Sequence, residues 1–227
     1  MLVVAILLTA VLSYLLGSCN SAIIVGKLIQ KKDIRDYGSH NAGLTNTLRC
    51  FGKGCAALTL IGDLGKGIVA VLLSKWLFHL LQVGFTPSMD LQLVGYIAGI
   101  FAILGHVFPL YYGFKGGKGV LVGVSVFLVI DWRVFCILIG VFIIVLILTK
   151  YVSLGSIIAS ACCPVVTFLM QHFRAESLPL WYQLVNTGMA ALMAGWVIFM
   201  HRSNIERLRS GTENRFSFHS SSKQKKA

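Results

Sequence analysis

Seven stretches of apolar residues follow one another along the chain, separated by short segments rich in Gly, Ser, Asn, Lys and Arg. A helix that crosses the hydrocarbon core of a bilayer needs about 20 mostly apolar residues, and most of these stretches come near that length. We therefore predict an all-α, polytopic membrane helix bundle with seven transmembrane helices. The predicted spans are Leu2–Val25, Cys55–Leu81, Leu91–Leu110, Gly119–Ile130, Val134–Leu148, Leu154–Met170 and Leu184–Met200.

The fourth stretch, Gly119–Ile130, is short. Its 12 residues reach only about 18 Å as a helix, against a core of roughly 30 Å, so it could be one half of a longer, broken span. Lys and Arg concentrate in cytoplasmic segments. Seven spans with the N-terminus outside put 16 of these residues inside and 2 outside, whereas merging the fourth and fifth stretches gives 9 and 8. Charge thus favours seven spans, a cytoplasmic C-terminus, and polar segments gathered on the cytoplasmic side.

The composition agrees with a membrane protein: 56% of the 227 residues are apolar and 12% are charged. The net charge of +12 does not indicate nucleic-acid binding, because the basic residues cluster between apolar runs, where membrane orientation explains them. Residues 1–214 are predicted to form one integral membrane domain, and residues 215–227 a basic, disordered cytoplasmic tail. The six cysteines lack metal-ligand spacing, so neither a metal site nor a cofactor is predicted.

The first inner segment, residues 33–49, alternates hydroxyl and amide side chains with glycine and ends in arginine. Such groups donate hydrogen bonds to phosphate or to an oxyanion, and an arginine can bind phosphate through two parallel bonds. Gly, Ser and Asn are also common turn residues, so a substrate site and a simple turn both fit this segment alone. The candidate site residues here are Ser39, Asn41, Gly43, Thr45, Asn46 and Arg49.

A second polar segment combines three glycines with two lysines after the third span. Glycine allows backbone N–H groups to converge on an anion, and a helix that begins near Gly119 would add the positive end of its dipole. The alternative is a tight basic loop that only obeys the charge preference of cytoplasmic segments. The candidate phosphate-binding residues are Lys115, Gly116, Gly117, Lys118 and Gly119.

Two further inner segments carry weaker signals. Ser153 and Ser156 stand at the entry to the sixth span, and His201, Asn204 and Arg207 follow the last span. If this last segment is helical, His201 and Asn204 share one face. Taken alone, a histidine at a membrane surface is more often solvated than catalytic.

Charged residues also occur inside the second span, where charge is energetically costly. Asp63 and Lys66 are three residues apart, and a membrane-embedded ion pair usually faces the bundle interior. We predict that this pair, with His106 from the third span, supports the site without performing chemistry. The spacing of Gly95 with Gly99, and of Gly119 with Gly123, predicts close helix packing.

Several short motifs follow one another in order along nearly the whole chain: Gly17-Ser18, Asp33-Ile34-Arg35, the run from Gly38 to Asn46, the strings GHVFP and FKGGKGV between Gly105 and Val120, Val152 to Ile157, and His201 to Glu213. Taken together, these motifs resemble the PlsY family of bacterial membrane acyl-phosphate:glycerol-3-phosphate acyltransferases. One departure is visible: Leu121 and Val122 stand where the family often has small and hydroxyl residues.

The resemblance implies transfer of a fatty acyl group from acyl phosphate to the sn-1 hydroxyl of glycerol 3-phosphate, giving lysophosphatidic acid and phosphate. This would be the first acylation of phospholipid synthesis, at the cytoplasmic side of the bacterial inner membrane, with no cofactor and no obligatory protein partner. It also implies catalytic roles for His201, Asn204, Ser39, Arg49 and Lys115. His201 with Asn204 would orient or deprotonate the glycerol hydroxyl, although a phosphate oxygen could accept that proton instead.

Two other classes fit parts of the pattern. A small transporter of a phosphorylated solute would also use phosphate-binding loops and the charges at Asp63 and Lys66. Transporters commonly have repeated halves and a site near the midplane, whereas here the polar motifs collect on one side and no repeat is detectable. A purely structural membrane protein would leave the four polar segments unexplained.

Overall fold

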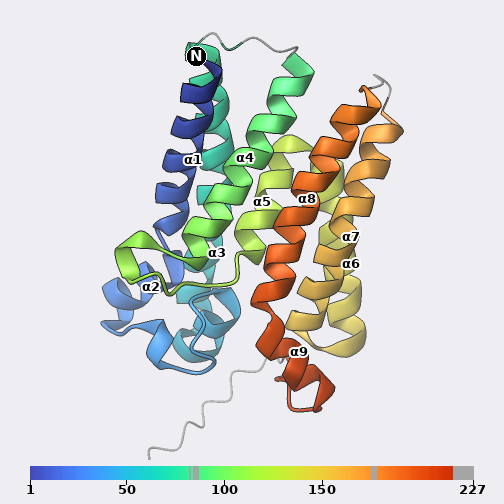
Figure 1. The fold of residues 1–227 in the computed structure, drawn as a ribbon. Helices are drawn as coiled ribbons and strands as arrows, with labels where there is room; N and C mark the ends of the chain where they lie inside the picture. The colour runs from blue at the N-terminus through green and yellow to red at the C-terminus, as the bar shows by residue number, and fades with distance from the viewer. Residues whose placement is uncertain (82, 84–86, 175–177, 217–227) are drawn as a thin grey trace, which may run out of the picture.

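The computed structural model describes residues 1–81, 83, 87–174 and 178–216, and within them every regular element is a helix. The long helices run side by side as a bundle (Figure 1), with the N-terminus at one end and most of the polar segments toward the other. The elements are α1 (Leu2–Ser18), α2 (Ser21–Val25), η1 (Gly26–Gln30), η2 (Ile34–Asp36), α3 (Leu44–Leu80), α4 (Pro87–Val107), η3 (Leu110–Tyr112), α5 (Val120–Ile130), α6 (Trp132–Thr149), α7 (Val152–His172), α8 (Leu180–Met200) and α9 (Arg202–Arg209).

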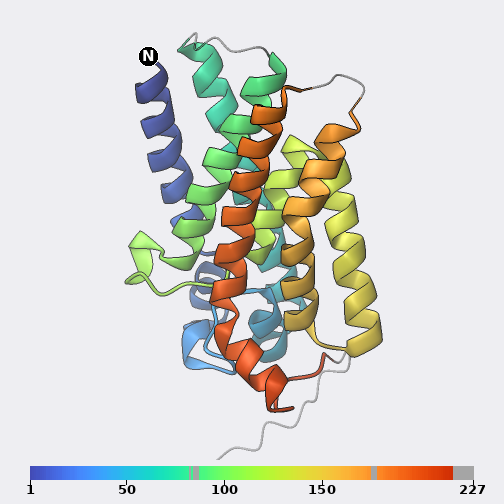
Figure 2. The same ribbon diagram turned by 45° about the vertical axis from the view of Figure 1, so that its right-hand side comes forward.

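Six of the described helical segments are long and apolar enough to cross a membrane, and the short helix α5 is the remaining apolar one. The prediction of an all-helical membrane bundle is therefore confirmed, while a seventh crossing stays a prediction. Helix α6 begins two residues after α5 ends and packs beside it, as Figure 2 also shows. Asp131, between them, accepts a hydrogen bond from Arg133 N and so caps the start of α6.

The first and second spans differ from their predicted bounds. The first was expected to run through Val25, but α1 ends at Ser18, and Asn20 starts α2 by accepting a hydrogen bond from Ile23 N. The second was expected to begin at Cys55, but α3 begins at Leu44 and is interrupted at Gly52, whose φ of 82° is outside the helical region. Most of the first inner segment after Gly43 is therefore helical.

The bundle packs closely at its small residues. A methyl group at Gly17 would lie 2.2 Å from Ala102 O, and one at Gly105 would lie 2.1 Å from Tyr14 O, so α1 and α4 meet backbone to backbone. The predicted packing role of Gly95 is confirmed, because a methyl group there would meet Ile130 on α5 at 2.5 Å. The same holds for Gly99 against Val126 and for Gly123 against Ile103.

Many large apolar side chains on the outside of the bundle are exposed, such as Ile147 and Leu148 on α6. An apolar surface of this extent requires lipid rather than water around it. Of the predicted tail, Phe216 donates from its backbone N–H to Lys150 O at 2.7 Å, and residues 217–227 lie outside the described residues.

Candidate active site

The loop between η2 and α3 is shaped by a single buried amide. Asn46 Nδ2 donates to the carbonyls of Ile34, Tyr37 and Asn41, and its Oδ1 accepts from Ser39 N at 2.9 Å. Asn46 is only 1% exposed. These bonds position Ser39 and Asn41, while substrate binding by Asn46, which also lines the cavity described below, stays a prediction.

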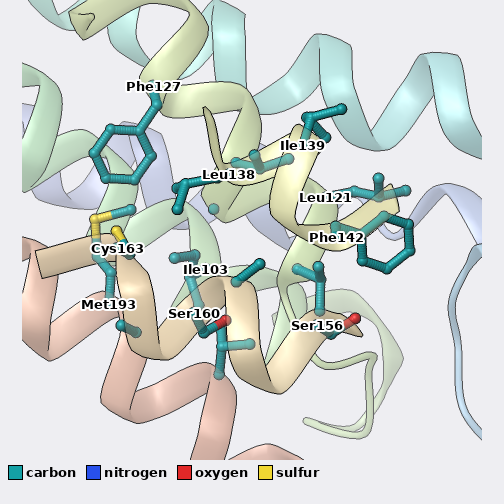
Figure 3. A pocket seen from close by; sticks show the side chains of 16 residues that line it. Ile103, Leu121, Phe127, Leu138, Ile139, Phe142, Ser156, Ser160, Cys163 and Met193 are labelled. Carbon is teal, nitrogen blue, oxygen red and sulfur yellow. The ribbon is translucent and has the colours of Figure 1, made fainter. Parts of the chain in front are cut away.

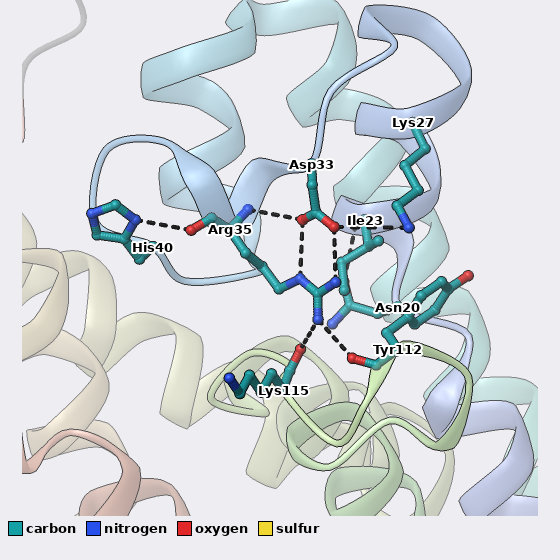
Figure 4. A network of polar contacts seen from close by, with 8 residues as sticks. All are labelled: Asn20, Ile23, Lys27, Asp33, Arg35, His40, Tyr112 and Lys115. Atoms are coloured by element: carbon teal, nitrogen blue, oxygen red, sulfur yellow. Dashed lines mark hydrogen bonds and ion pairs between the residues drawn. The ribbon is translucent and has the colours of Figure 1, made fainter.

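Arg35 connects this first loop to the Gly/Lys loop, residues 113–119 (Figure 4). Asp33 holds the guanidinium through Nε at 3.0 Å and Nη2 at 2.8 Å, and Nη1 donates to Tyr112 O at 2.7 Å and Lys115 O at 3.0 Å. Hydrogen bonding to Arg35 lowers the pKa of the Asp33 carboxyl from its ordinary value, which keeps the pair ionised. The two polar segments are thereby fixed relative to each other.

The Gly/Lys loop folds back on the end of α4. Gly116 N donates to Val107 O at 3.0 Å, and Gly117 N donates to His106 O at 3.1 Å. These two N–H groups do not converge on an anion as we expected, because they satisfy carbonyls at the C-terminal end of α4. A methyl group at Gly117 would lie 2.2 Å from His106 Nε2 and 2.5 Å from Ala42 O, so this position requires glycine.

The loop still offers cationic groups and a helix N-terminus to an anion. Gly119, with a φ of 83°, is the residue before α5, so the expectation of a helix that begins near Gly119 is confirmed. The Lys115 side chain is exposed, and Lys118 is partly buried. Burial, together with the nearby positive Arg207, lowers the pKa of Lys118 to about 8.

Glu213 organises the other side of the cavity. It accepts hydrogen bonds from Ser153 Oγ at 3.1 Å and Asn204 Nδ2 at 2.9 Å through Oε1, and from Arg207 Nε at 2.8 Å through Oε2. Asn204 Oδ1 in turn accepts a hydrogen bond from Lys118 Nζ. One carboxylate thus links α7, α9 and the Gly/Lys loop, a role that we did not assign to Glu213 from the sequence.

His201 lies at the junction of α8 and α9, and is 3% exposed. Its Nδ1 is 2.8 Å from Val197 O, and since a carbonyl only accepts hydrogen bonds, Nδ1 carries the proton. Burial and the nearby Lys118 charge lower the pKa of His201 to about 4, so the ring is neutral near pH 7. Nε2 is then left as a proton acceptor.

The buried charged group beneath the loop forms as expected. Lys66 Nζ lies 2.8 Å from Asp63 Oδ1 and 2.8 Å from His106 Nδ1, and it also donates to Cys19 O at 3.2 Å. All three side chains are buried. Because His106 contacts Gly117 from below, this group supports the Gly/Lys loop from inside the bundle.

One cavity of about 480 Å³ brings these segments together. Every residue that the sequence suggested for the site contributes to its lining except Lys66, which acts through Asp63 and His106. Among the described residues, no group of three His, Cys, Asp or Glu side chains is placed to hold a metal ion. The lining includes Ser39, Asn41, Gly43, Thr45, Asn46, Arg49, Asp63, His106, Lys115, Gly116, Gly117, Lys118, Gly119, Ser153, Ser156, His201, Asn204 and Arg207.

A second, apolar pocket of about 100 Å³ adjoins the first, and both are lined by Val120, Leu121, Phe142 and Ser156. Fold and cavities together define the class: a multi-pass membrane protein in which a basic cavity, suited to phosphate-bearing molecules, lies next to an apolar one.

The comparisons with known proteins give the family. The family model described as glycerol-3-phosphate acyltransferase matches residues 7–211. The chain is 37% identical over 209 residues to the glycerol-3-phosphate acyltransferase of Clostridioides difficile (strain 630), covering 92% of this chain and 94% of that protein. It is 40% identical over 208 residues to the glycerol-3-phosphate acyltransferase of Staphylococcus saprophyticus, covering 92% and 96%.

Solved structures agree. The crystal structure of PlsY (YgiH), an integral membrane glycerol 3-phosphate acyltransferase, in its glycerol 3-phosphate form superposes with a TM-score of 0.76 at 30% identity, covering 93% of this chain and 96% of that one. Its lysophosphatidic acid form superposes with a TM-score of 0.74. The chain belongs to the glycerol-3-phosphate acyltransferase family, the PlsY family, and is therefore an acyltransferase of phospholipid biosynthesis. The resemblance found in the sequence is confirmed.

Proposed function

We propose that this protein transfers a fatty acyl group from acyl phosphate to the sn-1 hydroxyl of glycerol 3-phosphate, producing lysophosphatidic acid and inorganic phosphate. The observation that carries the proposal is the contact between a cationic cavity and an apolar pocket. An acyl phosphate has both an anionic head and an apolar tail, so it can occupy the two at once, while glycerol 3-phosphate needs only the cationic cavity.

The reaction forms one ester bond and breaks one anhydride bond. The glycerol hydroxyl oxygen attacks the acyl carbonyl carbon, the carbon–oxygen bond to phosphate breaks, and the phosphate leaves with the bonding electron pair. The donor is already activated, so the protein mainly has to orient two anions and stabilise developing charge. Lys115, Lys118 and the start of α5 hold one phosphate, and Ser39, Asn41, Thr45 and Arg49 hold the other or the carbonyl oxygen.

His201 accepts the hydroxyl proton in this scheme. Its Nδ1 donates a hydrogen bond to Val197 O, so Nε2 is the ring nitrogen that can accept a proton. Burial keeps the ring uncharged near neutral pH. Asn204 orients Lys118 beside it, and Glu213 fixes Asn204, Ser153 and Arg207. A phosphate oxygen of the substrate is the alternative proton acceptor, and loss of His201 distinguishes the two.

We also propose the membrane placement that the charges favour. Seven crossings, with α5 as the short fourth one, put the N-terminus outside and the cavity on the cytoplasmic side of the bacterial inner membrane. The 11 residues of α5 span only about 17 Å, which is less than the thickness of the hydrocarbon core. The cavity would fill the remaining thickness on the cytoplasmic side. Soluble glycerol 3-phosphate would then enter from the cytoplasm, and the acyl chain sideways from lipid.

The test is purified protein in detergent with palmitoyl phosphate and labelled glycerol 3-phosphate, without acyl carrier protein, coenzyme A or added metal. Labelled lysophosphatidic acid is the expected product, with one phosphate released per acyl group transferred. Absence of product from this mixture, together with product formation when acyl coenzyme A replaces the acyl phosphate, would refute the proposed donor. Movement of labelled glycerol 3-phosphate into proteoliposomes without acylation would instead indicate a transporter.

A further inference from the structure

The apolar pocket has two distinct ends, visible in Figure 3. At one end Leu121, Phe142 and Ser156 lie together, and at the other Phe127, Cys163 and Met193 do. The first end is shared with the basic cavity, so a chain bound to a reacting headgroup enters there. Between the ends the wall is built mostly from small or aliphatic side chains of α5, α6, α7 and α8.

The distance between the ends follows from helix geometry. Leu121 and Phe127 are six residues apart on α5, and Ser156 and Cys163 are seven apart on α7. At about 1.5 Å per residue, the pocket extends about 10 Å along the bundle from the reacting end. Its long axis therefore follows the direction in which an extended acyl chain would run.

The far end is closed by buried side chains from four helices. Phe127, Leu138, Cys163 and Met193 are exposed by only 2%, 5%, 4% and 3%, respectively. Phe127 also packs on the buried ring of Tyr96, which holds it in place from the α4 side. A chain end that reaches these side chains meets packed protein and cannot extend further without displacing it.

We propose that Phe127, Leu138, Cys163 and Met193 form a stop that sets the acyl-chain length this enzyme prefers. This inference rests on the proposed function, since the chain enters the pocket as part of an acyl phosphate. Each methylene that fits in front of the stop raises kcat/KM about fourfold, because it is buried in the pocket. A methylene that does not fit gives no such gain and displaces the headgroup from its reactive position. The length preference therefore follows from the volume in front of these four side chains.

Two substitutions move the stop in opposite directions. Cys163→Phe fills the far end, and if it displaces two methylenes it lowers kcat/KM for acyl phosphates that reach the stop about 15-fold while changing that for butanoyl phosphate little. Met193→Ala removes side chain from the same end and moves the preference toward longer chains. Val165→Phe is the matched control, because Val165 is on α7 as well but is 60% exposed toward the surroundings.

The measurement is the initial rate with a series from butanoyl to stearoyl phosphate at saturating glycerol 3-phosphate. Opposite shifts of the optimum in Cys163→Phe and Met193→Ala, with the wild-type profile in Val165→Phe, support the stop. Should Cys163→Phe not fold, the shift in Met193→Ala still decides, because that change only removes atoms. An active wild type whose profile is unchanged in the folded variants overturns the stop alone, whereas a wild type inactive with every acyl phosphate overturns the proposed function as well.

Discussion

Replacing Arg35 by alanine should damage the reaction although Arg35 is absent from the lining of the basic cavity. Arg35 Nη1 is the donor that holds the carbonyls of Tyr112 and Lys115, and it links the first loop to the Gly/Lys loop. Without it, the two loops keep their own contacts but lose their fixed separation. We expect KM for glycerol 3-phosphate to rise and kcat to fall together, because both depend on that separation.

The magnitude follows from two hydrogen bonds with a charged donor. Each contributes about 1.5 to 3 kcal/mol, and the Arg35 side chain is 23% exposed, so the lower figure applies. Loss of both then amounts to about 3 kcal/mol, or about 100-fold in kcat/KM if this free energy is lost mainly from the positioning of the Gly/Lys loop. Arg35→Lys keeps the charge but lacks the planar fork, and should recover only a small part.

The chain contains a matched control. Asp131 and Arg133 repeat the arrangement of Asp33 and Arg35, with Nε at 2.9 Å and Nη2 at 2.7 Å from the carboxylate and a further bond to Met170 O at 3.1 Å. Neither residue lines the basic cavity. The assay is the steady-state rate against glycerol 3-phosphate, with thermal stability in detergent measured in parallel. If Arg35→Ala and Arg133→Ala lose equal activity at equal stability, the loops are not held in register by Arg35.

Three further predictions concern the cavity itself. The pKa of Lys118 is about 8 in the free protein, so its positive charge is present below that pH and lost above it. KM for glycerol 3-phosphate should therefore rise as the pH increases through 8, and Lys118→Arg should remove that rise. His201→Gln should lower kcat about 100-fold or more, and turnover within a few-fold of wild type would assign the proton to a substrate phosphate. Because the pKa of His201 is about 4, kcat/KM of the wild type should stay constant from pH 7 down to near 5. Gly117→Ala should cost about 1 to 3 kcal/mol of stability and raise KM, because its methyl group meets His106. Gly140→Ala, inside α6 and with open space around it, should leave KM unchanged and should not lower the melting temperature, since alanine is more stable than glycine in a helix.

Much of the bundle could be predicted from hydrophobic runs, because a membrane forces long helices to be apolar almost throughout. The break after Ser18 could not, since Ala22, Ile23 and Ile24 continue the run and only Asn20 signals a new helix start. The early start of α3 was missed for the opposite reason: residues 44–54 carry polar groups and glycines that suggest a loop. In residues 44–54, packing and hydrogen bonds of the polar side chains, and not hydropathy, determine the helical conformation.

The site was predictable as a set of segments but not as a set of contacts. Residue types and order indicated which segments line the basic cavity, and the charge distribution indicated that they would meet. Arg35 reaches Lys115 across 80 positions, and Ser153 reaches Glu213 across 60, so no local pattern could reveal either bond. The same limit applies to Asn46, whose three carbonyl partners could not be read from the residues around it.

The return of the Gly/Lys loop onto α4 has an electrostatic consequence. The last turn of any helix presents carbonyl oxygens with partial negative charge, equivalent to about half an electron, and α4 ends beside the basic cavity. The N–H group of Gly116 donates to Val107 O and that of Gly117 to His106 O, so the chain masks this repulsive helix terminus with its own amides. A phosphate bound in the basic cavity would therefore meet ammonium groups and the N-terminal end of α5, and would be screened from the negative end of α4.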